Sequence, residues 1–240
     1  MAPIKDSLIL LTHIPKCAGS SFRESVIEPN IDESMIMRAG GGIRELRRRT
    51  KDFRYLVGHW PFGIENFFAR SNPVRERPIK RVVILRDPID QMISFYYYHK
   101  QLGAGSPLSR VTNMLGLVDF YKSSWGHCNL QTQFLAGVFY QSNRSPLKLL
   151  NRFAPNFVYR KAVDNLEKYY DFVIVQSRSN EGFKQFAHEL GLQLKSTVCE
   201  ETVTRERPSA SSLSDLDRAS LAELSIYDAM LYQRADELAP

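Results

Sequence analysis

The sequence predicts an α/β fold in which a central parallel sheet is flanked by helices. Residues 8–11 and 82–85 are short, continuous apolar runs, as buried parallel strands are, and each is followed by a turn and a helical pattern. The chain has 240 residues, 43% of them hydrophobic, which suits one substantial core better than two. We therefore expect a single domain over residues 1–240, with ligands bound at the carboxyl ends of its strands.

The first predicted strand, residues 8–12, leads into a loop suited to binding an anion. Pro15 ends the strand, Lys16 supplies a charge, and the small residues 18–21 precede a helix predicted over residues 20–27. Small residues let backbone N–H groups approach a phosphate, and the amino end of the helix attracts it. The domain is thus P-loop-like. Lys16 precedes Gly19, contrary to the Walker pattern, which disfavours an ordinary ATP or GTP site. A plain strand-to-helix turn is the alternative.

The next segments predict two further strands separated by a basic helix. Residues 35–37 form a short strand, glycines 40–42 break the chain, and residues 53–57 form another strand. Between them, residues 43–50 predict a helix that carries four arginines. This helix is either a solvated face or a surface for an acidic glycan.

A histidine follows the strand at residues 53–57, in the sequence Gly58-His59-Trp60-Pro61. At the carboxyl edge of the sheet, His59 could reach a cleft and titrate near neutral pH. It is either a general base or a structural histidine bonded to a carbonyl, and its place between two phosphate-binding stretches favours the base. His13 lies close to the loop and either lines the site or closes the strand. His99 follows an aromatic run that predicts core packing.

A second stretch suited to ligand binding follows the strand at residues 82–85. Arg86 stands at the carboxyl end of that strand, and Pro88 opens a helix at a position that tolerates proline. Ser94 lies two turns into the helix. The planar donor fork of an arginine at this edge suits a phosphate.

These stretches together resemble sulfotransferases that use 3'-phosphoadenosine 5'-phosphosulfate (PAPS). Lys16-Cys17-Ala18-Gly19-Ser20-Ser21 is similar to the family's 5'-phosphosulfate loop, and Arg86 with Ser94 is similar to its 3'-phosphate motif. The resemblance is to the carbohydrate branch that includes the heparan sulfate 2-O-sulfotransferases. It extends to segments 58–61, 129–135, 165–166 and 204–208. Cys17 stands where family members often carry threonine, so one hydroxyl contact to phosphate is lost.

The resemblance implies the sulfotransferase fold and transfer of a sulfuryl group from PAPS to a hydroxyl acceptor, with a carbohydrate favoured. It implies that Lys16 neutralises the leaving group, that His59 takes the acceptor's proton, and that no metal is needed. The residues expected to bind PAPS are Lys16, Cys17, Ala18, Gly19, Ser20, Ser21, Phe22, Arg86, Ser94 and Arg205. Arg205 either belongs to a late basic loop that closes over the nucleotide or to a solvated connector.

Two other functions compete with this one. A nucleotide or small-molecule kinase with a degenerate phosphate loop would need a carboxylate for Mg²⁺, and Asp87 is the obvious candidate. A non-catalytic binder of sulfated or phosphorylated ligands would keep the fold without the chemistry. The joint presence of Lys16, His59, Arg86 and Ser94 favours an enzyme.

The rest of the chain is predicted to be mostly helical. Helices are expected over residues 108–121, 129–135, 146–153, 164–170 and 180–190, with a strand at 172–175. Residues 196–212 predict a loop, and residues 213–238 predict one long amphipathic helix.

Composition limits the remaining function classes. The formal charge of +6 suits an anionic ligand, but no nucleic-acid-reading motif is present, so no nucleic-acid partner is expected. Three widely spaced cysteines exclude a full disulfide framework and show no zinc spacing, which fits a reducing compartment. No apolar run approaches the roughly 20 residues of a membrane span. These features predict a cytoplasmic protein.

Overall fold

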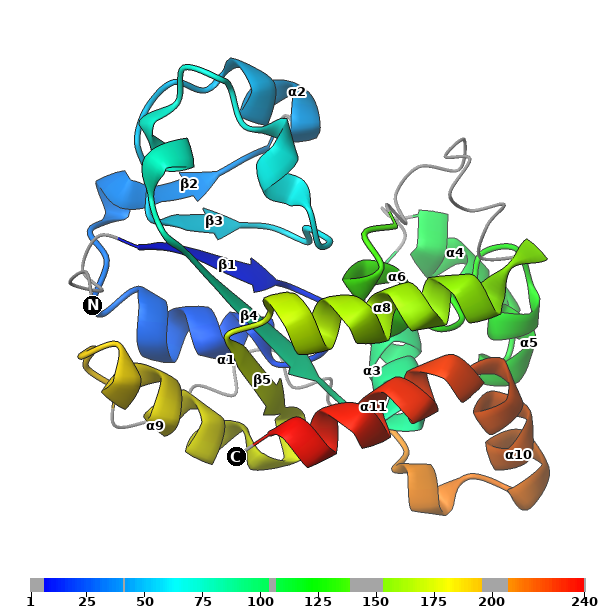
Figure 1. The fold of residues 1–240 in the computed structure, drawn as a ribbon. Coiled ribbons are helices and arrows are strands. Elements are labelled where there is room, and N and C mark those ends of the chain that lie inside the picture. The colour runs from blue at the N-terminus through cyan, green and yellow to red at the C-terminus, as the bar shows by residue number, and fades with distance from the viewer. Residues whose placement is uncertain (1–6, 41, 104–106, 139–152, 196–206, 240) are drawn as a thin grey trace.

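The computed structural model describes residues 7–40, 42–103, 107–138, 153–195 and 207–239. A central five-stranded parallel sheet is flanked by helices, which confirms the predicted α/β architecture (Figure 1). The strand order is β2-β3-β1-β4-β5. The strands are β1 (Leu8–Thr12), β2 (Ile36–Arg38), β3 (Tyr55–Val57), β4 (Ile79–Leu85) and β5 (Phe172–Val175).

The apolar runs of the sequence form the middle strands of this sheet. Side chains of these strands are buried on both faces of the sheet. From β1, Ile9 and Leu11 pack in a cluster with Phe22 and Phe183, while Leu10 belongs to a cluster on the other face. A strand buried on both faces needs consecutive apolar residues, which explains the uninterrupted pattern. Thr12 pairs with Val83 in the parallel register between β1 and β4. The loop after β1 and the residue after β4 therefore leave the sheet at the same edge.

The helices surround the sheet and continue beyond its carboxyl edge. In Figure 1, the arrowheads of β1, β3 and β4 point towards the part of the molecule that carries α3, α4 and α6. The helices are α1 (Gly19–Phe22), α2 (Gly42–Arg48), α3 (Pro88–Gln101), α4 (Pro107–Met114), α5 (Leu117–Lys122), α6 (Leu130–Leu135), α8 (Pro155–Tyr169), α9 (Ser179–Glu189), α10 (Asp215–Leu224) and α11 (Ile226–Leu238). The helix of α1 continues in a π-helical segment, η2 (Arg23–Ile27).

Three predicted helices differ from those in the structure. Residues 108–121 form two helices, α4 and α5, because Gly116 is extended at the amino end of α5. Residues 213–238 form α10 and α11, separated at Ser225, whose hydroxyl donates to the Leu221 carbonyl at 2.8 Å. The helix before β5 begins at Pro155 rather than at residue 164, with proline at its first position. Most of the predicted helix 146–153 and of the loop 196–212 lies outside the described residues.

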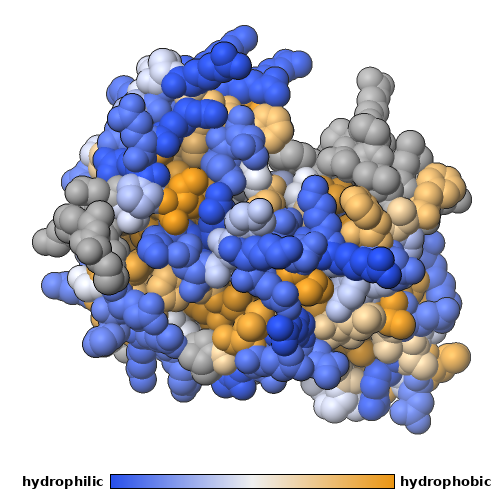
Figure 2. All heavy atoms as spheres, viewed as in Figure 1, coloured by the Kyte–Doolittle hydropathy of each residue, from blue (hydrophilic) through white to orange (hydrophobic). Residues whose placement is uncertain are grey.

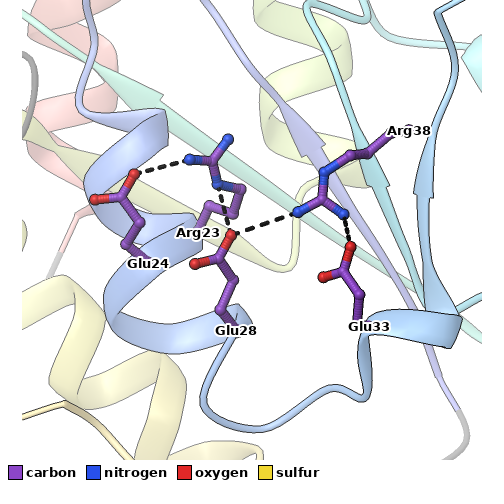
Figure 3. Close-up of polar contacts among 5 residues, drawn as sticks. All are labelled: Arg23, Glu24, Glu28, Glu33 and Arg38. Carbon is purple, nitrogen blue, oxygen red and sulfur yellow. Dashed lines mark hydrogen bonds and ion pairs between the residues drawn. The ribbon is translucent and has the colours of Figure 1, made fainter.

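A chain of ion pairs ties the first helical segment to the edge strand β2 (Figure 3). Arg23 lies 2.8 Å from Glu24 and 3.1 Å from Glu28, and Glu28 lies 3.7 Å from Arg38. Arg38 also pairs with Glu33. Single exposed pairs stabilise a protein by only about 0–1 kcal/mol, but this network links consecutive turns of one segment to a strand. It thereby fixes the direction in which the helix leaves the loop after β1.

The surface facing the viewer in Figure 2 is largely polar, with smaller apolar patches between the polar side chains. Within the described ranges, no helix combines the length and the apolar character needed to cross a membrane.

The amino ends of α6 and α11 cap each other. The Asn129 side-chain oxygen accepts from the amides of Tyr227 and Asp228 at 2.9 and 3.0 Å. In return, the Asp228 carboxylate accepts from the amides of Gln131 and Thr132 at 3.1 and 2.7 Å. Amides in the first turn of a helix lack intrahelical acceptors, so each side chain supplies what the other helix needs. We call this contact the reciprocal cap.

Replacing Asp228 with alanine should lower the free energy of unfolding by about 2–4 kcal/mol, since it removes a cap and leaves buried donors unsatisfied. Thermal unfolding measures this loss, and Asp215→Ala, at an exposed aspartate of α10, is the control.

Burial raises the pKa of Asp228 from 3.8 to about 6. The native state therefore binds the proton more tightly, and stability should fall as the pH rises from 4 to 6. The same slope in Asp228→Asn would contradict this assignment.

Candidate functional site

The loop after β1 has an unusual backbone held in place by its neighbours. Lys16 and Ala18 have φ values of 67° and 62°, in the left-handed region that residues other than glycine rarely adopt. Such residues cost on the order of 1–3 kcal/mol each, so surrounding contacts must fix them. The Gln91 side chain donates to the Pro15 carbonyl at 3.0 Å, and Arg86 Nη1 donates to the Lys16 carbonyl at 3.1 Å. Arg86, directly after β4, and Gln91 of α3 thus hold the loop in one shape.

The helix that follows offers amides at its start. The Phe22 amide donates to the Ala18 carbonyl at 3.0 Å, and Ala18 provides no side-chain cap. This is the first intrahelical bond of α1. The amides of Gly19, Ser20 and Ser21 come before Phe22 in the first turn, where helical amides lack an intrahelical acceptor. A Cβ on Gly19 would lie 2.2 Å from the His13 ring. Only glycine therefore lets the loop close against His13.

Three cations converge beside this loop. Burial, followed by repulsion from Arg86 and Arg207, lowers the pKa of Lys16 from 10.5 to about 8. Burial and repulsion from Arg207 also lower the pKa of Arg86. Within the described part of the chain, Arg86 Nε and Arg207 Nη1 are buried without a hydrogen-bond partner. Asp90 lies 4.0 Å from Arg207. Asp90 balances part of the charge of Arg207, and the remaining positive charge forms a site that an anion would stabilise.

Arg86 is positioned by Gln131, a fully buried residue of α6. The Gln131 side-chain oxygen accepts from the Arg86 amide at 3.0 Å, and its nitrogen donates to the Arg86 carbonyl at 2.8 Å. The Gln131 amide in turn donates to Asp228. The reciprocal cap therefore supports the residue that fixes the backbone of Arg86.

A cavity of about 360 Å³ opens next to the loop. Its described walls come from the loop, from the segment after β3, and from α3 and α4. The lining residues are His13, Pro15, Lys16, Ala18, Gly19, Ser20, His59, Phe95, Tyr98, His99, Leu102 and Leu108. Lys16 Nζ lies 4.3 Å from the centre of the Tyr98 ring, so the lysine crosses from the loop towards α3.

His59 lies at this cavity in a defined tautomer. Its Nδ1 is 2.9 Å from the His13 carbonyl oxygen. A carbonyl can only accept, so Nδ1 carries the proton and Nε2 has the lone pair. Desolvation by the surrounding protein lowers the pKa of His59, although its side chain stays open to solvent on one side. Burial, followed by the charge of His59, lowers the pKa of His13 to about 3. Both rings are therefore neutral at pH 7, and His59 can accept a proton.

The structure brings most of the sequence-predicted site residues together. Lys16, Ala18, Gly19, Ser20 and His59 line the cavity. Arg86 adjoins the same loop through the Lys16 carbonyl. Ser21 follows in the first turn of α1, half-buried.

Three other predicted residues have buried side chains that do not line the cavity. The Cys17 thiol is 1% exposed and lies 3.8 Å from Gln131 Oε1, and burial raises its pKa. The Phe22 ring is fully buried in the core, and its amide bonds to Ala18. Ser94 is 2% exposed within α3 and does not line the cavity. Arg205 lies outside the described residues.

Sequence reasoning does not single out two residues that the structure places at the candidate site, Arg207 and Gln131. Arg207 lies two positions after Arg205 in the same basic segment, which therefore signalled an arginine but not which one. Gln131 lies in segment 129–135, which the resemblance included without a role. Of the two alternatives for His13, the structure places its ring at the cavity, and its carbonyl fixes the tautomer of His59.

Comparisons with protein-family models and with curated proteins found no match to this chain. In the described ranges, no group of three or more histidine, cysteine, aspartate or glutamate side chains could hold a metal ion. A function must therefore be argued from the site itself.

Proposed function

We propose that this protein is a PAPS-dependent O-sulfotransferase. The observation that carries the proposal is the convergence of Lys16, Arg86 and Arg207 beside a loop whose helical amides face the same edge of the sheet. His59, with its Nε2 lone pair, lies at the adjoining cavity. An anion site next to a proton acceptor is the arrangement that transfer of a charged group to a hydroxyl requires.

The residues can be given roles in that reaction. The amides of residues 19–21 and Lys16 would hold the 5'-phosphosulfate, and Arg86 with Arg207 would hold the 3'-phosphate. The acceptor oxygen forms a bond to sulfur while the bond from sulfur to the 5'-phosphate oxygen breaks. The acceptor's proton passes to His59 Nε2. Lys16 neutralises the charge that develops on the departing phosphate.

A kinase is less well supported by the same residues. Asp87, the carboxylate that could hold Mg²⁺, accepts from the Asp90 amide at 2.9 Å and caps α3. A non-catalytic binder would use the same cations, so only turnover separates it from the enzyme.

Thermal unfolding with 3',5'-adenosine bisphosphate tests the donor site, with ATP or ADP plus Mg²⁺ as the comparison. A ligand at ~100 times its dissociation constant adds about 2.7 kcal/mol, which should raise the midpoint by roughly 5 °C or more. A shift with the bisphosphate alone supports the proposal, and a shift only with ATP and Mg²⁺ favours the kinase. Binding of the bisphosphate without any sulfuryl release from PAPS would favour the non-catalytic binder.

The affinity for the bisphosphate should fall as the pH rises through 8. Lys16, with its pKa of about 8 before an anion binds, must carry its proton in the complex. Above pH 8, binding therefore requires proton uptake, and the affinity should drop about fivefold between pH 8 and pH 9. Calorimetric titration measures this slope. In Lys16→Arg the charge persists at all these pH values, so an equal slope in that variant would assign the effect to another group.

A further inference from the structure

Arg86 lies one residue beyond the paired part of the sheet. The parallel register of β4 with β5 ends at Leu85, opposite Val175. A backbone amide and carbonyl shielded from water at such a place need other partners, because an unpaired polar group there costs free energy. The Gln131 side chain supplies both partners, since it accepts from the Arg86 amide at 3.0 Å and donates to the Arg86 carbonyl at 2.8 Å. Gln131 thus gives Arg86 the bonds that a neighbouring strand would give.

The same carboxamide contacts the loop after β1. The Cys17 thiol lies 3.8 Å from Gln131 Oε1, and burial raises the pKa of this thiol, so the sulfur keeps its proton and can donate. Cys17 stands between Lys16 and Ala18, the two loop residues whose φ values lie in the left-handed region. A contact that fixes Cys17 therefore helps to fix the strained part of the loop.

Gln131 is itself held in one position. It is fully buried, and its backbone amide donates to the Asp228 carboxylate at 3.1 Å, within the reciprocal cap. Gln133, two residues later on α6, is also buried, but its side chain donates to the Cys128 carbonyl at 2.7 Å, just before its own helix. The two glutamines therefore differ in what they support, although they share a helix and a buried environment.

The contacts of Gln131 join the two halves of the proposed nucleotide site. In the proposed function, the loop with Lys16 holds the 5'-phosphosulfate, and Arg86 holds the 3'-phosphate. An anion that orders the loop also orders, through Cys17 and Gln131, the backbone of Arg86. The second phosphate then meets residues that are already fixed, which lowers the entropic cost of its binding. The bond from Arg86 Nη1 to the Lys16 carbonyl adds a direct link between the halves.

We propose that Gln131 is a positioning residue that couples the two phosphate subsites, so that each phosphate of the nucleotide strengthens the binding of the other. This inference rests on the proposed function, because it takes the assignment of one phosphate to the loop and of the other to Arg86. Coupling of this kind makes the affinity for a nucleotide with both phosphates exceed what the two single contributions predict.

Calorimetric titration of the full chain with four ligands measures the coupling. The ligands are adenosine, its 5'-monophosphate, its 3'-monophosphate and 3',5'-adenosine bisphosphate, with displacement of the bisphosphate used for the weak ones. The affinity gained from the 3'-phosphate is determined with and without the 5'-phosphate, and the ratio of the two gains is the coupling factor. We expect a factor of about 5 or more in the parent, at the lower end of typical coupling between sites.

Gln131→Met should lower the coupling factor at least threefold, because methionine has a similar length but no donor for the Arg86 carbonyl. Gln133→Met is the matched control, since it removes a buried carboxamide from the same helix. Both variants should lose stability in thermal unfolding, so a merely structural role would affect them alike. Cys17→Ala breaks the contact with the loop while leaving the bonds between Gln131 and Arg86, and it should lower the factor as well. Cys17→Ser keeps a donor and should retain more of the coupling than Cys17→Ala does.

The outcomes separate this inference from the proposed function. A coupling factor that falls in Gln131→Met and Cys17→Ala, but not in Gln133→Met, supports the inference. If the bisphosphate binds to the parent but Gln131→Met leaves the factor unchanged, or Gln133→Met lowers it equally, the inference is wrong and the proposed function stands. If Gln131→Met does not fold, Cys17→Ala decides in the same way. If the parent binds none of these nucleotides, the proposed function fails and the inference fails with it.

Discussion

His59→Ala is expected to lower kcat by about 10²-fold to 10⁴-fold, the range typical of a positioned general base. Affinity for 3',5'-adenosine bisphosphate should stay near the parent's level, because the three cations proposed to hold its phosphates, Lys16, Arg86 and Arg207, remain in place. Sulfuryl transfer measured alongside calorimetric binding separates the two effects. His188→Ala, an exposed histidine on α9, is the matched control.

The pH profile gives an independent check on His59. In the proposed reaction the neutral ring of His59 is the active form, and desolvation lowers the pKa of His59 below 6.5. On the acid side, kcat/KM should therefore decline as the pH falls below 6.5, and His59→Gln should lack that decline. Normal turnover in a well-folded His59→Ala protein would show that the proton goes elsewhere.

Arg86→Ala is expected to weaken binding of the bisphosphate by about 10-fold to 150-fold, which corresponds to the roughly 1.5–3 kcal/mol of a charged hydrogen bond. The variant removes the guanidinium group, whose Nε is buried without a hydrogen-bond partner, and it also frees the Lys16 carbonyl that Arg86 Nη1 now contacts. Arg86→Lys should recover only part of the affinity, because a lysine keeps the charge but not the planar fork. Calorimetric titration measures both variants.

A second readout distinguishes loss of the phosphate contact from general damage. Repulsion from Arg86 helps to lower the pKa of Lys16, so Arg86→Ala should move the pH dependence of binding upwards from about 8. Arg218→Ala, in an exposed pair with Asp215 at 3.5 Å, should change neither property. Parental affinity in a folded Arg86→Ala protein would mean that the anion lies elsewhere.

Local sequence patterns were enough to predict strands at the centre of the fold. The bounds of β1 and β5 match the prediction, because a strand covered on both faces needs a continuous apolar run that turn residues interrupt. His59 could be placed near the loop for a topological reason, since β3 lies beside β1 in the sheet. Neighbouring parallel strands end at one edge, whatever separates them along the chain.

The supporting contacts could not be predicted because they depend on tertiary structure. The break at Ser225 lies within a continuous amphipathic pattern, and Asn129, almost 100 residues earlier in the chain, caps the new helix. Arg207 reaches the cation cluster from a segment whose spacing shows no periodicity. Helical spacing placed Ser94 on α3 but could not show that it is buried.

The reciprocal cap makes the last helix and the anion site energetically interdependent. Opening of α11 would withdraw Asp228 from the Gln131 amide, and Gln131 holds the backbone of Arg86. An anion that favours the ordered Arg86 must, by the same linkage, disfavour the opening of α11. Slower hydrogen exchange in the amides of residues 226–238 would then report that the site is occupied. Gln131 would couple the two regions, without any contact between that helix and the nucleotide.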